Sequence, residues 1–269
     1  MTIHKACLYL LALSAAVAAC TAERTDSDAA TDVTRDTTYR IDSVIVPQPR
    51  LPRGVADEAD DRSRLLPVDE AAEAPDFFAY RMRLIEAVGA RDTSALFALM
   101  SNDIRVSFGA ENGQSAFREM WRPAQADSEL WRRLARVLGG GGVYEEDSLT
   151  SADGRPASAR FTAPYYFARF PGEEFDAFQH GVLLGPDIPV RERPEPGAPI
   201  LERLSYAIVR TPDFFAPRET ASGDWIRIEL DENRFGFVPA EQIESPVGYR
   251  ALFNRIDGAW TMTAFVAGD

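Results

Sequence analysis

The chain has 269 residues with 42 acidic and 29 basic side chains, a formal net charge of -13. That excess of acid argues against a nucleic-acid partner, because phosphate binding needs clustered cationic side chains. Beyond residue 20 the chain has no cysteine or lysine and a single histidine, which excludes disulfides, lysine nucleophiles and multi-histidine zinc sites there.

The first twenty residues predict export. His4 and Lys5 precede an apolar run over 6–17, which is shorter than the about 20 residues that a spanning helix needs. Val17-Ala18-Ala19-Cys20 resembles the bacterial lipobox. The resemblance implies that residues 1–19 are a signal peptide and that Cys20 carries lipid. Thr21, in place of an Asp, then implies the outer membrane, facing the periplasm. The alternative is an ordinary signal peptide with a chance cysteine.

Residues 20–74 have the composition of a disordered acidic tether. They are rich in Ala, Asp, Thr, Ser and Pro, and Tyr39 is their only aromatic residue. Such a segment cannot bury enough apolar surface to offset the entropy of ordering. The apolar island from Ile41 to Val46 leaves open a short strand against the folded part, which we expect to start near Pro75.

Residues 75–180 predict an α+β domain. Phe77, Leu84 and Val88 share one face of a first helix. Asp92 and Thr93 can cap a second helix that runs to Met100. The following expected elements are an alternating strand over 104–108, helices over 114–121 and 128–138, and one or two aromatic-rich strands over 160–170.

From Gly181 onward the pattern changes to short strands separated by turns rich in Pro, Gly and Asp. The expected strands are 182–184, 188–191, 200–204, 207–210, 225–230, 235–239, 250–254 and 260–266. The last two are joined by Asp257-Gly258, a dipeptide typical of a tight hairpin turn.

Residues 181–248 resemble bacterial Src-homology-3 domains. Val190-Arg191 is followed by a Pro- and Gly-rich turn and a strand that ends at Leu204. Gly223-Asp224-Trp225 then opens a strand, and Phe235-Gly236-Phe237-Val238 follows an acidic turn. The resemblance implies a small β-barrel in which Gly236 allows close strand packing. The loop from Thr211 to Ser222 is longer than is usual in the family, which alters the surface where relatives bind ligands.

The flanking segments resemble the cone-shaped SnoaL or nuclear-transport-factor-2 fold. The resemblance rests on the leading helix pair, the strand before Gly109, the helix with Phe117 and Trp121, and the final hairpin with Trp260. It implies that residues 249–269 return to complete the domain of residues 75–180. An α+β domain of another kind is the alternative.

Acidic residues near His180 are the first candidates for chemistry. Asp176 lies four residues before His180, with Glu173 and Glu174 upstream, and this spacing could form an acid–base pair or a metal site. One histidine with loosely spaced acids favours a surface or junction role. The cluster of Glu145, Glu146 and Asp147 indicates a solvated turn. We therefore predict no catalytic residue, no metal and no cofactor.

Aromatic residues near loops of the expected barrel are the candidates for ligand binding. They are Tyr206, Phe214, Phe215 and Trp225. In Src-homology-3-like folds a groove between such loops takes peptides by stacking on aromatic rings. Core positions are the favoured interpretation of Trp225 and the nearby Phe235, so Phe214 and Phe215 are the stronger pair for a contact surface.

The sequence as a whole indicates a non-enzymatic lipoprotein, held to a membrane through lipid on Cys20, that binds peptidoglycan, a peptide or another envelope protein. A rival hypothesis is a small-molecule or enzymatic pocket in the cone-like domain, lined by Phe108, Trp121, Tyr165 or Trp260. A third is a structural assembly scaffold, in which the two domains bury each other's aromatic faces and leave no groove.

Overall fold

The computed structural model describes residues 63–145, 159–212, 225–231 and 234–268, and the backbone of two short paired strands, β1 (Tyr39–Ile41) and β2 (Val44–Val46). Helices and strands are both present, so the predicted α+β class is confirmed. The predicted signal peptide and Cys20 lie outside the described residues. Within those residues, no helix combines the length and apolar character needed to cross a membrane.

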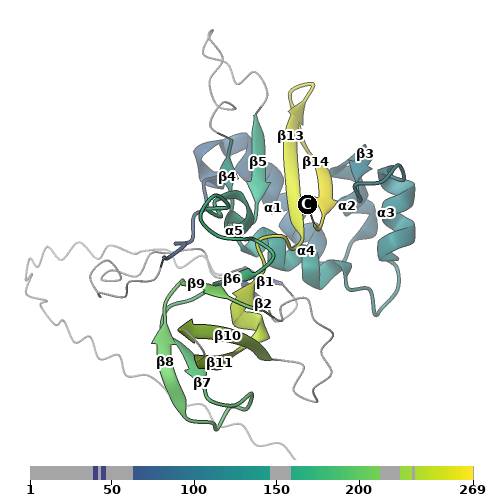
Figure 1. Cartoon of the computed structure of the whole chain (residues 1–269). Coiled ribbons are helices and arrows are strands. Elements are labelled where there is room, and N and C mark those ends of the chain that lie inside the picture. Colours follow the sequence, from purple (N-terminus) through teal and green to yellow (C-terminus); the bar gives the residue numbers. More distant parts are fainter. Residues whose placement is uncertain are drawn as a thin grey trace, which may run out of the picture. The chain divides into compact units, whose positions relative to one another are not determined.

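A five-stranded sheet, built from residues 100–163 and from the last two strands, forms the centre of what we call the first part of the molecule (Figure 1). In spatial order its strands are β3 (Met100–Arg105), β14 (Ala259–Val266), β13 (Arg250–Ile256), β5 (Arg160–Ala163) and β4 (Val143–Tyr144). β3 runs parallel to β14, and the other pairs are antiparallel. The final hairpin therefore lies in the middle of a sheet whose other strands come from residues 100–163.

The turn of that hairpin confirms the local prediction. Asp257 and Gly258 have φ values of 49° and 81°. Positive φ at both central residues is the conformation that matches the twist of paired strands, and Asp-Gly tolerates it.

Helices cover this sheet. They are α1 (Pro75–Gly89), α2 (Thr93–Ala98), α3 (Gly113–Trp121) and α4 (Leu130–Gly139). Pro75 suits the first turn of α1, where its missing N–H leaves no hydrogen bond unmade. The predicted cap of the second helix is confirmed, since the Asp92 side chain accepts a hydrogen bond from the backbone N–H of Ala95 (3.0 Å).

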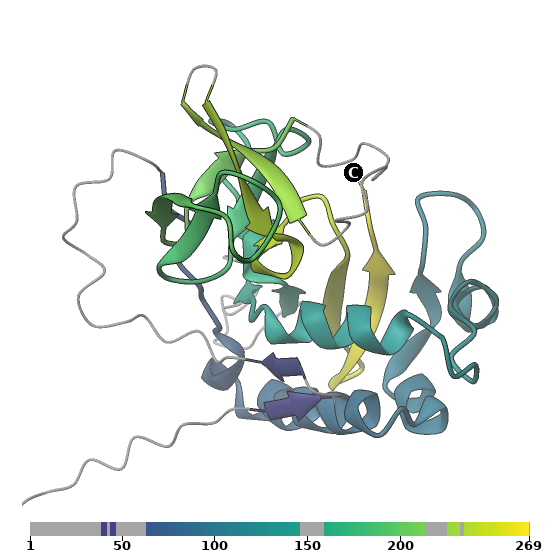
Figure 2. The same ribbon diagram turned by 90° about the horizontal axis from the view of Figure 1, so that it is seen from below.

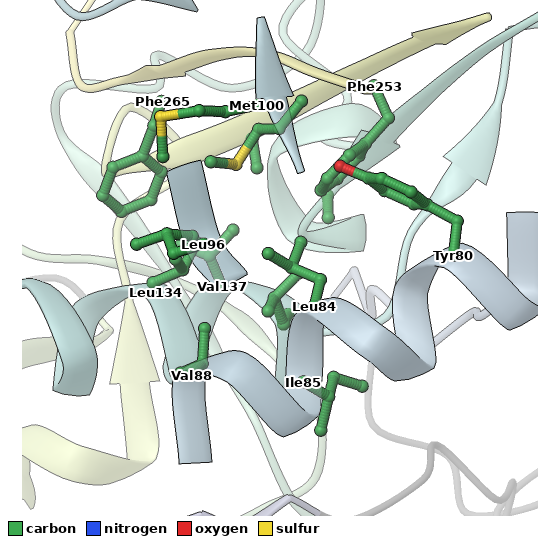
Figure 3. Close-up of a cluster of buried hydrophobic side chains, with 14 of the residues drawn as sticks. Tyr80, Leu84, Ile85, Val88, Leu96, Met100, Leu134, Val137, Phe253 and Phe265 are labelled. Atoms are coloured by element: carbon green, nitrogen blue, oxygen red, sulfur yellow. The ribbon is translucent and has the colours of Figure 1, made fainter. Parts of the chain in front are cut away.

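The space between helices and sheet is filled by large side chains (Figure 3). Leu84 and Val88 on α1 and Leu134 on α4 are buried together with Phe253 and Phe265 of the hairpin. Burial of each such side chain stabilises the fold by about 1.5–3 kcal/mol. The ring of Phe77 lies at the centre of an aromatic group, with its centroid 4.4 Å from that of Phe161 and 4.7 Å from that of Trp260.

Residues 180–244 form two further sheets around a second core. One has the order β10-β11-β7-β8 and the other β12-β6-β9. The strands are β6 (His180–Leu183), β7 (Ile188–Arg191), β8 (Ile200–Leu204), β9 (Ile208–Arg210), β10 (Trp225–Asp231), β11 (Arg234–Pro239) and β12 (Ile243–Glu244). A short 3₁₀ helix, η2 (Ala240–Gln242), precedes β12. The pairings among the described residues do not close the two sheets into one barrel.

One predicted strand is partly wrong. Residues 160–170 were expected to form strands throughout, but β5 ends at Ala163 and a helical turn, α5 (Tyr165–Ala168), follows. Pro164 between them cannot donate a ladder hydrogen bond. Tyr165 and Tyr166 of this turn are buried together with Val182 and Ile208 in a third cluster.

The expected start of the folded part near Pro75 is also wrong. Ser63 accepts a backbone hydrogen bond from Ile208 (2.9 Å), and Val68 accepts one from Gly142 (3.1 Å). A helical turn, η1 (Ala71–Glu73), then leads into α1. Backbone pairing with two separate parts of the chain orders this stretch, although its composition predicts disorder. The predicted domain boundaries otherwise stay a prediction.

A buried ion pair fixes the same stretch. Arg81 on α1 donates from Nη1 to Asp69 (2.7 Å) and from Nη2 to the backbone oxygen of Leu138 (2.6 Å). The two charged side chains are 4% and 8% exposed. Arg81 therefore joins the segment before α1 to the end of α4.

Candidate functional site

A cleft of about 900 Å³ lies beside α4. One wall is the polar face of α4, and the other comes from residues 240–249, with Phe178 and the chain end at Ala267 and Gly268 completing it. We call it the α4 cleft. In Figure 2, α4 is the teal helix that crosses the yellow strands of the hairpin, and the green β-rich part of the chain lies above it.

The position of the arginines in the α4 cleft follows from the sequence of the helix. Leu130, Leu134 and Leu138 recur at a spacing of four and are buried in the core. Arg132, Arg133 and Arg136 fall on the opposite side, where residues three and four apart are neighbours on the helix surface. All three therefore line the cleft.

Arg136 joins the two walls. Its Nε forms an ion pair with Glu244 of β12, and its Nη2 donates to the backbone oxygen of Glu241 (2.9 Å). Burial lowers the pKa of this guanidinium, and Arg132 lowers it further, whereas the neighbouring Tyr166 and Glu241 raise it. The charge of Arg136 is balanced by Glu244, so the main role of Arg136 is to link the two walls of the cleft.

Arg132 and Arg133 are arranged differently, because both contact the one carboxylate of Glu129. Arg133 donates to it from Nε (2.9 Å) and Nη2 (2.7 Å), and Arg132 from Nη2 (3.2 Å). The hydrogen bonds and charge of Arg133, followed by the charge of Arg132, lower the pKa of Glu129. The guanidinium carbon of Arg133 lies 5.2 Å from the ring centroid of Tyr249, a cation–π distance.

The opposite wall combines an acid with apolar side chains. Glu241 is exposed and Phe178 is 48% exposed, whereas Ile243 and Val247 are buried. The phenol of Tyr166 is also part of the lining, and its burial raises its pKa well above the ordinary value, so that it stays neutral. The cleft thus offers guanidinium groups, a carboxylate and aromatic faces to one bound molecule.

A second hollow, of about 330 Å³, lies beside His180. The Nδ1 of His180 donates to the backbone oxygen of Asp176 (2.9 Å). The carboxylate of Asp176 instead accepts from the backbone N–H of Phe178 and from Gln179 (both 2.8 Å). The carboxylate of Asp176 therefore does not hydrogen-bond the imidazole, and the spacing of four does not form an acid–base pair.

The predicted ligand-binding residues are not brought together. Tyr206 is 4% exposed, and its backbone oxygen accepts from Leu65 (2.9 Å), so the expected exposed ring is not observed. The ring of Tyr206 is covered because residues 63–68 are ordered beside it by backbone hydrogen bonds. The tether-like composition of residues 63–68 does not predict this. Trp225 is half-buried on β10, next to Ile226, which lines the α4 cleft. Phe214, Phe215 and Cys20 lie outside the described residues.

The four residues proposed to line an enclosed pocket are also separated. Trp121 and Trp260 are buried in the main core, whereas Tyr165 lies in the third cluster. Phe108 is 49% exposed, with the guanidinium of Arg250 5.5 Å from its ring centroid. These four side chains therefore do not belong to one cluster.

Sequence reasoning missed the α4 arginines. Three arginines on the polar side of an amphipathic helix stand out in a strongly acidic chain, and that signal was available. No comparable signal pointed to the opposite wall of the cleft, because Arg136 and Glu244 are 108 residues apart in the chain.

Comparison of the chain with models of known protein families, with curated proteins and with solved structures finds no match. Among the described residues, no three His, Cys, Asp or Glu side chains gather closely enough to share a metal ion.

Proposed function

We propose that this chain is a binding module of the bacterial cell envelope, tethered through lipid on Cys20, and that it binds peptide carried by peptidoglycan or by an envelope protein. The observation that carries the binding role is the α4 cleft. At about 900 Å³ it lies within the range of small-molecule and peptide sites, and polar groups converge in it among apolar side chains.

The charge of the cleft supports a specific ligand. In a chain with a net charge of -13, three arginines meet on one short helix face. Guanidinium groups gathered in a cleft attract anionic groups, even where the protein as a whole is acidic. Peptides of the envelope that carry free carboxylates fit this requirement.

The strand pattern supports the proposed Src-homology-3-like class for residues 181–248. The strand with Val190 and Arg191, the strand that ends at Leu204 and the hairpin β10-β11 occur where the resemblance implies them. A Cβ atom added to Gly236 would lie 2.3 Å from a methyl carbon of Val190, so only glycine fits there. The order of the five-stranded sheet likewise supports a cone-like class for the first part.

The scaffold alternative finds partial support. Tyr165 and Tyr166 are buried against Val182 and Ile208, as expected if the two parts cover each other's aromatic faces. That alternative also required the absence of a groove between them. The α4 cleft lies there, so the binding role is favoured.

Sedimentation with purified peptidoglycan sacculi tests the proposed function. The purified full chain is expected to co-sediment in a saturable manner, and Trp225→Ala and Phe214→Ala report whether the aromatic residues near the long loop contribute. A chain that stays in the supernatant at every sacculus concentration, and also captures no envelope peptide, would contradict the proposal. The tether is tested separately by Cys20→Ser, which should move the protein from the membrane fraction to the soluble fraction.

A further inference from the structure

We infer that the ligand of the α4 cleft is a short peptide with a free carboxylate, and that Arg132 and Arg133 hold this carboxylate. The inference rests on the proposed binding role of the cleft and adds to it the chemical group that is recognised and the orientation of the ligand.

Charged groups at the mouth of the cleft favour an anionic ligand. Arg132 and Arg133 are two permanent cations, and the only carboxylate that they contact among the described residues is that of Glu129. The side chains of Arg132 and Arg133 are 64% and 40% exposed, so both can be reached from solvent. Within the part of the chain that the structure describes, these two cations therefore have only one carboxylate in direct contact.

The two arginines also supply hydrogen-bond donors that suit a carboxylate. A guanidinium carries five N–H groups in a fixed plane that matches a carboxylate in a bidentate manner. Glu129 takes Nη2 of Arg132 and both Nε and Nη2 of Arg133. Nε and Nη1 of Arg132 and Nη1 of Arg133 make no hydrogen bond to the part of the chain that the structure describes.

Neighbouring side chains restrict the movement of Arg133. Arg133 is held by Glu129 on one side and by the ring of Tyr249 on the other. Tyr249 in turn stacks on the buried ring of Phe265, with centroids 5.2 Å apart. A cation held in place before the ligand arrives loses little side-chain entropy on binding. The carboxylate site is thus partly pre-organised.

The opposite wall sets the orientation of the ligand. The backbone oxygen of Glu241 accepts from Arg136, whereas its exposed side-chain carboxylate has no hydrogen-bond partner within the described residues. A peptide with its carboxylate at Arg132 and Arg133 would direct an ammonium or N–H group toward Glu241. The exposed ring of Phe178, which also lines the cleft, offers a surface for an apolar side chain between these ends.

The test is a titration of the purified full chain with the tripeptide Ala-γ-Glu-Ala and with the same peptide amidated at both carboxylates. Calorimetry should give at least about tenfold weaker binding for the amidated peptide, because a hydrogen-bonded charge pair contributes about that factor. Arg132→Gln combined with Arg133→Gln should remove this difference. Arg193→Gln, which changes an exposed arginine paired with Glu192 and Glu195 instead, should leave the difference unchanged.

The outcomes separate this inference from the proposed function. Equal affinity of the unchanged protein for both peptides would overturn the carboxylate inference, and so would binding to sacculi with no binding of either peptide, while the binding role would stand. No binding to sacculi or to either peptide would overturn both. Circular dichroism of the double variant confirms that a loss of preference does not come from unfolding.

Discussion

The two sides of helix α4 face different environments. The inner side, with Leu134 at its centre, is packed against aromatic side chains from α1 and the final hairpin, which fill the interior. The outer side carries Arg132, Arg133 and Arg136 and borders an open cleft of about 900 Å³. Volume and apolar contact determine the inner side, so its residues are constrained by packing. On the outer side Arg136 is paired with Glu244 on the opposite wall, whereas Arg132 and Arg133, within the described residues, share the one carboxylate of Glu129 on their own helix end. Their remaining N–H groups face an open cleft and are available to a ligand.

The largest expected effect is on the inner side. Phe77 is fully buried and its ring contacts those of Phe161, Phe253 and Trp260. Phe77→Ala should lower the free energy of unfolding by about 3–5 kcal/mol, because a large cavity replaces the ring. Urea denaturation followed by tryptophan fluorescence measures the change. A loss below about 1 kcal/mol would show that the interior is not closely packed.

The second-largest effect concerns the buried ion pair between Asp69 and Arg81. Asp69→Asn leaves the buried guanidinium of Arg81 without its counter-charge, and we expect a loss of about 3 kcal/mol. The double variant Asp69→Leu with Arg81→Met should recover much of that loss, since a matched apolar pair removes both buried charges. If the single and double variants were equally unstable, the cost would come from shape and not from the uncompensated charge.

The third effect in size is a loss of stability at alkaline pH, measured as a lower free energy of unfolding. Burial raises the pKa of the hydroxyls of Tyr80 and Tyr166 above their ordinary value near 10. As pH rises past about 10 the unfolded chain releases these protons while the folded chain retains them, so the stability that is complete below that pH is progressively lost above it. Each such tyrosine contributes a slope of about 1.4 kcal/mol per pH unit. Urea denaturation between pH 9 and about 11.5 should show the decline, with a shallower slope for Tyr166→Phe. A stability that stays constant over this range would contradict the burial of these hydroxyls.

The smallest effect is expected at the tie across the α4 cleft. Glu244→Gln removes the counter-charge of Arg136, but both side chains are partly exposed, at 23% and 32%, so we expect a loss of about 1 kcal/mol or less. High salt should reduce the difference between the two proteins, since it screens a half-exposed pair. A loss of several kcal/mol would mean that the tie is essential to the fold and that the cleft is less open than its lining indicates.

Local signals allowed much of the fold to be predicted. Asp92 as a helix cap and Asp257-Gly258 as a hairpin turn each act over a few residues, and the structure confirms both. Such features depend on neighbours in the sequence, which a single chain displays directly.

Features that depend on distant partners could not be predicted in the same way. Residues 63–68 have a tether-like composition, yet backbone hydrogen bonds to residues 142 and 206–208 order them. Tyr206 is buried for the same reason. The second wall of the α4 cleft is likewise brought to the helix by tertiary packing, so the arginines were visible in the sequence and the cleft was not.

Chemical-shift mapping tests the central claim most directly, because it locates the ligand on the molecule. Addition of a soluble peptide released from sacculi to the isotope-labelled full chain should shift the amide signals of Ala240, Glu241, Gly248 and Tyr249, together with the side-chain signals of Arg132 and Arg133. Shifts that cluster instead around His180 and Arg210, or that spread over the surface without saturating, would contradict the claim that the α4 cleft is the binding site.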